Sequence, residues 1–161
     1  MDAVIAFFNQ NQWVYTRQED QPILQMRYQG ENGDWLCTAR AREDVGQFLF
    51  YSILAMGVPP KKRQAVAEFL TRVNFNLLLG NFEMDFTDGE IVFRTYGLAS
   101  GARGLAVETI GQLIFSNVLM MDKYLPGILA VMSLNISPEE ALRRMTEPPT
   151  APGAAAAKAD M

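Results

Sequence analysis

Residues 23–54 read ILQMRYQ (23–29), GENG (30–33), DWLCTARAR (34–42), EDVG (43–46) and QFLFYSIL (47–54). In the first and third segments, apolar or small side chains alternate with polar ones, which is the pattern of a strand with one buried face. Residues 47–54 are apolar on both faces, which indicates a central strand. The segments between them contain the glycine, amide and acidic residues of turns. The stretch therefore predicts a three-stranded antiparallel meander.

Helices are predicted on either side of the meander and at the end of the chain. Apolar side chains recur at helical spacing in residues 2–10 and again between residues 60 and 80. A long apolar helix is expected from about residue 102 to 124, and Pro126-Gly127 should break it. Ser137, followed by a proline and two acids, has the signature of a capping box and predicts a last short helix.

A second pair of strands is predicted after residue 80. Residues 82–86 and 91–95 alternate in polarity around Asp88-Gly89, which predicts a hairpin with a two-residue turn whose residues both need a positive φ. The resulting order is α-β-β-β-α-β-β-α-α. We therefore expect an α+β fold, in which helices pack on an antiparallel sheet made of the meander and the hairpin.

Length and composition limit what the protein can be. The chain has 161 residues, a net charge of −4, one cysteine and no histidine. These counts exclude catalysis by a serine or cysteine that needs a histidine base, multi-cysteine or histidine metal sites, and an internal disulfide. The acidic balance argues against a nucleic-acid partner. We expect a cytoplasmic protein with one domain, residues 1–145, and a disordered tail rich in proline and alanine, residues 146–161.

Neither a signal peptide nor a membrane span is predicted. The N-terminus has an acid, Asp2, and no basic residue before its apolar stretch, which is the reverse of a signal peptide. The most apolar region, residues 105–136, is interrupted by Asp122 and Lys123, so its uncharged segments are shorter than the ~20 residues that a span requires. We interpret this region as a buried core helix.

Several short motifs along the chain are similar to those of the YbjN family of small bacterial proteins, some of which are described as sensory transduction regulators. The motifs are Gly33-Asp34-Trp35-Leu36-Cys37, Phe50-Tyr51-Ser52, Val58-Pro59, Arg63, Glu68-Phe69-Leu70-Thr71-Arg72-Val73-Asn74, Gly80-Asn81-Phe82-Glu83-Met84-Asp85 and Asp88-Gly89-Glu90-Ile91. The resemblance covers about residues 13–144. It implies a fold like that of type III secretion chaperones, which are homodimers that bind partner polypeptides. It carries no catalytic or ligand-binding residues.

An acidic cluster surrounds the predicted hairpin turn and is a candidate cation site. Its members are Glu83, Asp85, Asp88 and Glu90. Calcium loops need oxygen ligands at alternate positions, whereas here Phe86 lies between two of the acids. Acidic residues are also common beside an Asp-Gly turn and on the solvent face of a strand. We therefore favour ordinary hairpin chemistry and predict no metal.

Other candidate sites also have simpler interpretations. The glycines of residues 97–104 lack both the lysine of a P-loop and the spacing of a dinucleotide fingerprint, so we expect a strand-to-helix joint. The run Lys61-Lys62-Arg63 is interpreted as a solvated first helical turn, with contact to an acidic partner as the alternative. Cys37 shares a face with Trp35 and has no histidine to activate it, so we expect a buried structural thiol.

The leading functional prediction is a non-enzymatic protein-binding domain with a chaperone-like or regulatory role, acting as a homodimer. The helical region of residues 102–136 carries more large apolar side chains than one buried stripe needs, and a two-fold interface would cover the excess. The competing interpretation is that other helices of the same chain cover it. Candidate interface residues are Phe115, Leu119, Met120, Ile128 and Met132. The alternative function is a small-ligand sensor with a pocket between sheet and helices; neither hypothesis includes a cofactor.

Overall fold

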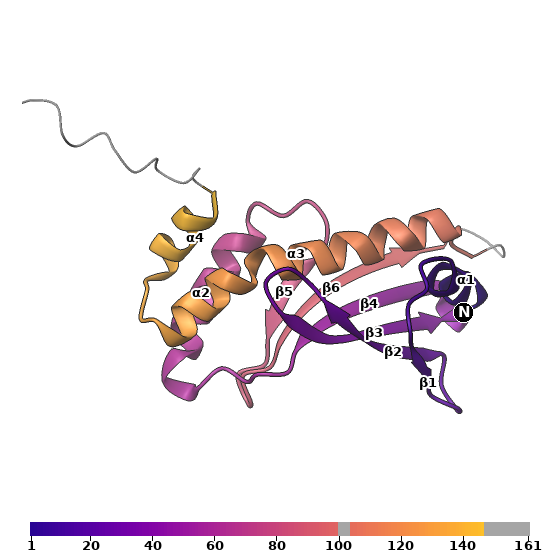
Figure 1. The fold of residues 1–161 in the computed structure, drawn as a ribbon, viewed down its shortest axis with the longest axis horizontal. Helices are drawn as coiled ribbons and strands as arrows, with labels where there is room; N and C mark the ends of the chain where they lie inside the picture. The colour runs from indigo at the N-terminus through magenta and orange to yellow at the C-terminus, as the bar shows by residue number, and fades with distance from the viewer. Residues whose placement is uncertain (100–103, 147–161) are drawn as a thin grey trace, which may run out of the picture.

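A computed structural model describes residues 1–99 and 104–146 of the chain. Its centre is a six-stranded antiparallel sheet in the order β1-β2-β3-β4-β6-β5 (Figure 1). The strands are β1 (Thr16–Arg17), β2 (Ile23–Gln29), β3 (Asp34–Arg42), β4 (Gln47–Leu54), β5 (Asn81–Met84) and β6 (Ile91–Leu98). The helices are α1 (Asp2–Gln10), α2 (Arg63–Asn74), α3 (Val107–Ser133) and α4 (Pro138–Thr146), with short 3-10 turns at Glu43–Val45 and Pro60–Lys62. The predicted α+β class is confirmed.

Strands β2, β3 and β4 form the predicted meander. Burial along β2 and β3 follows the alternation of the sequence, so that Leu24, Ala39 and Phe50 lie side by side on the buried face. β1 was not predicted. It has two residues, which pair with Leu24 and Gln25 of β2, and a strand of that length is too short to show a periodic pattern.

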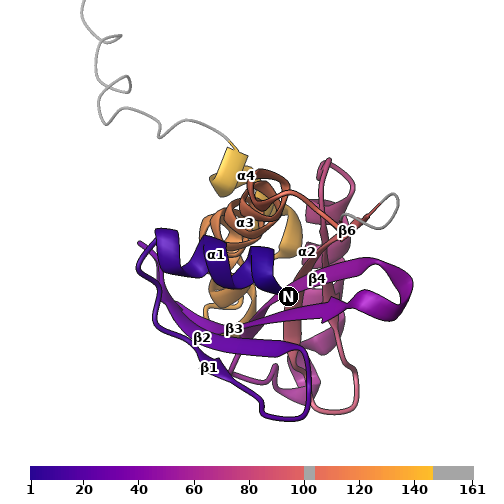
Figure 2. The same ribbon diagram turned by 90° about the vertical axis from the view of Figure 1, so that its right-hand side faces the viewer.

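The described helices cover one face of the sheet. α3 lies across β4 and β6, α1 packs beside α3, and α2 lies against α3 and β5 (Figures 1 and 2). α4 packs on α2 and α3. The hydrophobic core fills the space between this helical layer and the sheet. Its largest fully buried side chains include Phe8, Trp35, Phe50, Phe69, Phe93, Ile114, Met121 and Ile128.

α3 is one continuous helix, so the predicted break at Pro126-Gly127 is wrong. Proline has no N–H, which leaves the carbonyl of Asp122 without its helical donor. That carbonyl instead accepts a hydrogen bond of 3.2 Å from Nδ2 of Asn32, in the turn between β2 and β3. At Gly127 the ring of Phe69 packs so closely that a Cβ would collide with it. Tertiary contacts thus compensate for both helix-breaking residues.

Among the described helices, α3 alone is long and apolar enough to cross a membrane by length and composition. Half of its most apolar window (50%) is buried inside the protein. The buried side chains face β4, β6 and the neighbouring helices, as in the core helix of a globular domain. The structure therefore agrees with the interpretation of this region as a core helix.

The hairpin of β5 and β6 has a longer loop than predicted. β5 ends at Met84, and Phe86, expected in the strand, lies exposed in the loop. The amide of Asp85 donates to the carbonyl of Glu90, and the amide of Gly89 donates to the carbonyl of Asp85. Within the Asp88-Gly89 pair, Gly89 has a positive φ of +84°, whereas the φ of Asp88 is not positive. The Asp-Gly pair is therefore the end of a longer turn and not a two-residue turn of its own.

The predicted starts of the last two helices can be compared with those of α3 and α4. Ser137 Oγ accepts a hydrogen bond of 3.2 Å from the amide of Glu140, which confirms the predicted cap of α4. The long helix begins at Val107 among the described residues, later than predicted. Residues 100–103 and 147–161 lie outside the described residues, as does nearly all of the predicted tail. The boundary at residue 145 and the disorder of the tail therefore remain predictions.

Candidate functional site

The face of the sheet opposite the helices carries a group of apolar side chains that we call the open sheet face. Cross-strand pairing aligns Leu36 with Ile53 and Ile53 with Val92, and it aligns Leu49 with Tyr96. Leu49 is buried, with 8% exposure, and the other four residues lie outside the buried core. The open sheet face consists of Leu36, Leu49, Tyr51, Ile53, Val92, Tyr96 and Leu98.

Solvent reaches a substantial part of the open sheet face. Leu36, Tyr96 and Leu98 are 45%, 54% and 66% exposed, whereas Tyr51, Ile53 and Val92 are half-buried. Antiparallel sheets that face water on one side usually have polar residues on that side. An apolar sheet face without a covering layer is a common feature of protein-interaction surfaces.

Arginine side chains lie among these apolar residues. They are Arg27, Arg40, Arg42 and Arg94. Arg27 forms an ion pair with Asp34, and Arg94 forms one with Glu83. Arg40 has no ion pair among residues 1–99 and 104–146. Tyrosine and arginine are enriched in protein–protein interfaces, so the composition of this face suits contact with a polypeptide.

The candidate interface residues on α3 separate into two groups. Phe115 and Leu119 are 41% and 56% exposed, and Met120 is half-buried. Ile128 and Met132 lie inside the core, with at most 6% exposure. Those two cannot contact a partner in this fold, because α2 and α4 cover that part of α3 within the chain. The competing interpretation is therefore correct for the second half of the helix, and the candidate interface narrows to Phe115, Leu119 and Met120.

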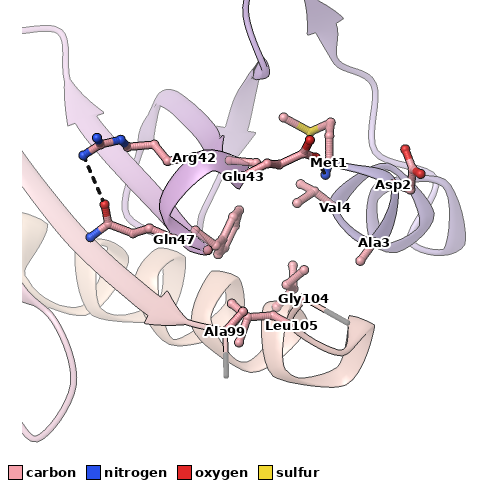
Figure 3. A pocket seen from close by; sticks show the side chains of 14 residues that line it. Met1, Asp2, Ala3, Val4, Arg42, Glu43, Gln47, Ala99, Gly104 and Leu105 are labelled. Carbon is pink, nitrogen blue, oxygen red and sulfur yellow. Dashed lines mark hydrogen bonds and ion pairs between the residues drawn. The ribbon is translucent and has the colours of Figure 1, made fainter. Parts of the chain in front are cut away.

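A cavity of about 480 Å³ lies between the start of α1, the turn after β3 and the region where β6 leads to α3 (Figure 3). Most of its polar groups pair with one another. Arg42 donates to Oε1 of Gln47 over 3.5 Å, and the N-terminal ammonium of Met1 forms an ion pair with Glu43. That ion pair lowers the pKa of Glu43. The cavity is thus lined in part by paired polar groups, while Asp2, which also lines it, forms no ion pair among the described residues; Ala99 and Gly104 belong to the same lining.

The carboxylates of the hairpin bind nearby protein groups, and no group of three or more histidine, cysteine or acidic side chains is placed to hold a metal ion among the residues that the structure describes. Asp85 accepts the amide of Thr87 at 2.7 Å, and Asp88 accepts the amide of Glu90 at 2.9 Å. The bond from Thr87 lowers the pKa of Asp85. Glu83 pairs with Arg94 on the neighbouring strand. These carboxylates hold the loop and the strand pair together, which is ordinary hairpin chemistry, and the lack of a metal stays a prediction.

Arg63 was interpreted as part of a solvated helical turn, which is wrong for this residue. Its Nε donates to the carbonyl of Val58 at 3.0 Å, and its Nη1 donates to the carbonyl of Phe86 at 2.7 Å. The amide of Val58 also donates to the carbonyl of Gly89 in the hairpin loop, over 2.8 Å. Arg63 thus fixes the hairpin loop to the segment that begins α2. The sequence resemblance included Arg63, but no local pattern distinguishes it from the two lysines before it.

Cys37 is fully buried beside Trp35, as predicted. Ser52 lies between them and accepts a hydrogen bond of 2.8 Å from the indole Nε1 of Trp35; its Oγ is 3.5 Å from the sulfur. Burial raises the pKa of the Cys37 thiol to about 12. A thiol with this pKa stays protonated near neutral pH and is a poor nucleophile.

Asn117 is a buried polar residue of α3 that the sequence analysis missed. Its Nδ2 lies 3.0 Å from the carbonyls of both Phe50 and Phe93, and so donates to β4 and β6 together. Next to it, the hydroxyl of Thr95 donates to the carbonyl of Leu113 at 3.0 Å. This small network fixes α3 against the centre of the sheet. The one signal in the sequence is an amide within an apolar helical stripe.

Comparison with known proteins identifies the family. The family model described as "YbjN: Putative bacterial sensory transduction regulator" matches residues 1–130. The chain belongs to the YbjN family. A solved structure with the same fold is "Crystal structure of YbjN, a putative transcription regulator from E. coli", with 12% sequence identity and a TM-score of 0.53. The match covers 83% of this chain and 90% of that chain. No curated protein matches the sequence.

Membership of the YbjN family confirms the resemblance found in the sequence. The family description is that of a sensory transduction regulator, which supports a regulatory role. At 12% identity, the E. coli structure shows the fold alone. Three features therefore bear on function: the open sheet face, the exposed part of α3 and the cavity near α1.

Proposed function

We propose that the protein is a non-enzymatic regulatory domain that acts by binding another polypeptide, and that the open sheet face is the binding surface. The observation that carries this proposal is the apolar character of the face without any described helix over it. Leu36, Tyr96 and Leu98 remain largely exposed, although they lie on strands whose other face is in the core. Burying such a patch against a partner removes apolar surface from water.

Other features agree with this proposal. The net charge of −4 opposes non-specific binding to nucleic acid. The single thiol, Cys37, is buried and requires no oxidising compartment, so we place the protein in the cytoplasm. A chaperone-like role and a homodimeric state are part of the same proposal, and the partly exposed side chains on α3 support the dimer. A homodimer of this protein would carry two open sheet faces, one on each copy of the chain.

The proposal is tested by affinity capture from native lysate with matched variants. The double variant Tyr96→Glu with Leu98→Glu places two charges on the open sheet face. The control, Leu134→Glu, changes a residue of similar exposure, 68%, that lies after α3 and outside the sheet. We expect the wild type and the control to retain the same polypeptide and the double variant to lose it. Equal capture by all three proteins would contradict the proposal.

A small-ligand sensor is the second candidate, and the cavity of about 480 Å³ near α1 favours it. Cavities of this size suit a metabolite, although the pairing of Arg42 with Gln47 and of Met1 with Glu43 leaves few polar groups available. Native mass spectrometry of the protein purified without denaturation tests this function. A bound small molecule that is lost in the cavity-filling variant Ala3→Phe would support the sensor over the polypeptide binder.

A further inference from the structure

Most of the apolar side chains of the open sheet face form a band along two neighbouring strands. The apolar band consists of Leu49, Tyr51 and Ile53 of β4 and Val92, Tyr96 and Leu98 of β6. Antiparallel pairing places Ile53 beside Val92 and Leu49 beside Tyr96. At about 4.8 Å between strands and about 3.4 Å per residue, the band is roughly 10 Å wide and roughly 20 Å long. It lies on the side of the sheet away from the described helices (Figure 2).

An α-helix has the dimensions of the apolar band. A helix with its side chains is about 10–12 Å across, and about 13 of its residues span the length of the band. An extended segment suits the band less well, because β4 is hydrogen-bonded to β3 and β6 along its length. The amides and carbonyls of a strand laid on this face would be buried without partners, whereas a helix pairs its own. The band therefore favours a helix as its occupant.

Positive charges lie along one side of the apolar band, on β3. Arg40 is opposite Leu49 in the pairing of β3 with β4, and Arg42 points to the same side of the sheet two residues further along. We call these two exposed side chains the arginine border. Arg40 forms no ion pair within the described part of the chain, and Arg42 lies 3.8 Å from the carboxylate of Asp44. The arginine border therefore has guanidinium groups available for the carboxylates of a partner.

The open side of the sheet differs in charge from the rest of the chain. Its strands present four arginines, Arg27, Arg40, Arg42 and Arg94, and two acids, Asp34 and Glu83. Each acid pairs with one of these arginines. This side of the sheet thus has an excess of two positive charges, although the net charge of the chain is −4. An acidic partner is attracted to this side and repelled by the rest of the chain, which directs it to the sheet.

The apolar band favours a polypeptide over a nucleic acid as the acidic partner. Single-stranded nucleic acids bind sheets through aromatic side chains, on which their bases stack. Four of the six residues of the band are aliphatic and offer no aromatic surface: Leu49, Ile53, Val92 and Leu98. Aliphatic side chains pack instead against the apolar stripe of an amphipathic helix.

We infer that the open sheet face binds an amphipathic helix of a partner protein, with the apolar stripe of that helix on the apolar band and acidic side chains against the arginine border. The inference rests on the proposed function and specifies the chemistry of the polypeptide. Arg40 and Arg42 select glutamate or aspartate along one flank of the helix, and they determine which flank faces β3. The bound helix covers the outer face of β4 as α3 covers the inner face.

Synthetic helical peptides test the chemistry of the partner. The probe is a fluorescein-labelled peptide of about 14 residues, with leucine at helical spacing on one side and glutamate along one flank. One matched peptide has lysine at every glutamate position, and another has the composition of the probe in an order without a stripe. Fluorescence anisotropy with the full chain measures each dissociation constant. We expect the glutamate peptide to bind about tenfold more tightly than either matched peptide.

Charge reversal of the arginine border tests where the peptide binds. Arg40→Glu with Arg42→Glu should weaken binding of the glutamate peptide about tenfold and strengthen binding of the lysine peptide. The control, Arg17→Glu with Lys61→Glu, changes the net charge by the same amount at two exposed positions outside the open sheet face. It should change the affinity for the glutamate peptide less than about threefold. Circular dichroism confirms that each variant is folded.

The outcomes separate this inference from the proposed function. Lysate capture that depends on Tyr96 and Leu98, with equal binding of the glutamate and lysine peptides or of none, retains the proposed function and overturns the acidic helix. Capture that is independent of this face, with no peptide bound, overturns both.

Other occupants of the face give different results in the same experiment. If an oligothymidylate probe or a second copy of the chain binds, and Arg40→Glu with Arg42→Glu abolishes that binding, the face belongs to that occupant and the inference is overturned. A preference for the glutamate peptide that reverses in this variant and persists in the control supports the acidic helix.

Discussion

The two faces of β4 carry the same kind of side chain in different surroundings. On the inner face, Phe48 and Phe50 lie under the helical layer with at most 3% exposure. On the outer face, Tyr51 and Ile53 are half-buried by their neighbours in the sheet, and no described helix covers them. A strand that is apolar on both faces normally lies between two layers. Here only one of those layers is present among residues 1–99 and 104–146.

The comparison shows that apolar side chains have two uses in this fold. On the inner face they stabilise the protein, because folding removes them from water. On the outer face much of their surface is still hydrated after folding, so their contribution to the stability of the isolated chain is small. If the proposed function is correct, their contribution appears only when a partner binds. Substitutions on the two faces should therefore separate stability from binding.

The largest expected effect is the loss of a ring from the inner face. Phe50→Ala removes a side chain with 0% exposure from the centre of the core and should lower the free energy of unfolding by about 3–5 kcal/mol. Tyr51→Ala, one residue further along the same strand, should cost less than half as much. Urea denaturation followed by circular dichroism measures both values. Equal losses would show that the outer face is as important for folding as the inner face.

The sequence predicted one part of the sheet better than the other for a physical reason. In β2 and β3, the alternation of side chains reflects burial on one face, so the bounds of both strands follow from local pattern. The loop between β5 and β6 depends on bonds from Arg63 and Val58, which lie more than twenty residues earlier in the chain. Local pattern carries no information about such donors, and the predicted two-residue turn was therefore wrong.

The second largest expected effect on stability comes from the buried hydrogen bonds that Asn117 makes to the inner face of the sheet. Asn117→Ala removes the donor to the carbonyls of Phe50 and Phe93 and leaves both without this partner in the core. We expect a loss of about 1–3 kcal/mol in the free energy of unfolding. Ser116→Ala, the neighbouring residue on α3, serves as the control and should change stability by less than 1 kcal/mol. A neutral Asn117→Ala would show that water or a small rearrangement replaces the amide.

The candidate interface shows the same limit of sequence reasoning. From the sequence, Ile128 and Met132 are equivalent to Leu119, because all three are apolar residues within one long helical region. Only the packing of α2 and α4 against the end of α3 distinguishes them. The continuity of α3 through Pro126 likewise depends on Asn32, which lies far away in the sequence. Which part of an apolar helix faces solvent is a property of the tertiary fold.

The burial of Cys37 on the inner face predicts a pH dependence. In the unfolded chain this thiol loses its proton above a pKa of about 8.5. In the folded protein burial raises the pKa to about 12, so the folded state keeps the proton. Stability is therefore nearly unaffected at pH 7.5 and falls as the pH rises through 8.5 toward 12, by about 1.4 kcal/mol at pH 9.5. Denaturation of the wild type and of Cys37→Ala at pH 7.5 and 9.5 should show the extra loss in the wild type only. The same fall in both proteins would assign it to other groups.

The smallest expected effect on stability is on the open sheet face. Tyr96→Gln replaces a ring that is 54% exposed with a polar side chain, and it should change the free energy of unfolding by no more than about 0.5 kcal/mol. Its effect on association should be larger, because aromatic side chains supply much of the contact energy in protein interfaces. The measurement is a thermal melt beside affinity capture of the polypeptide retained by the wild type. An unchanged melting temperature with weakened capture is the expected result. A drop of several degrees would mean that the ring stabilises the isolated chain, and the difference between the two faces of β4 would then be smaller than their exposure indicates.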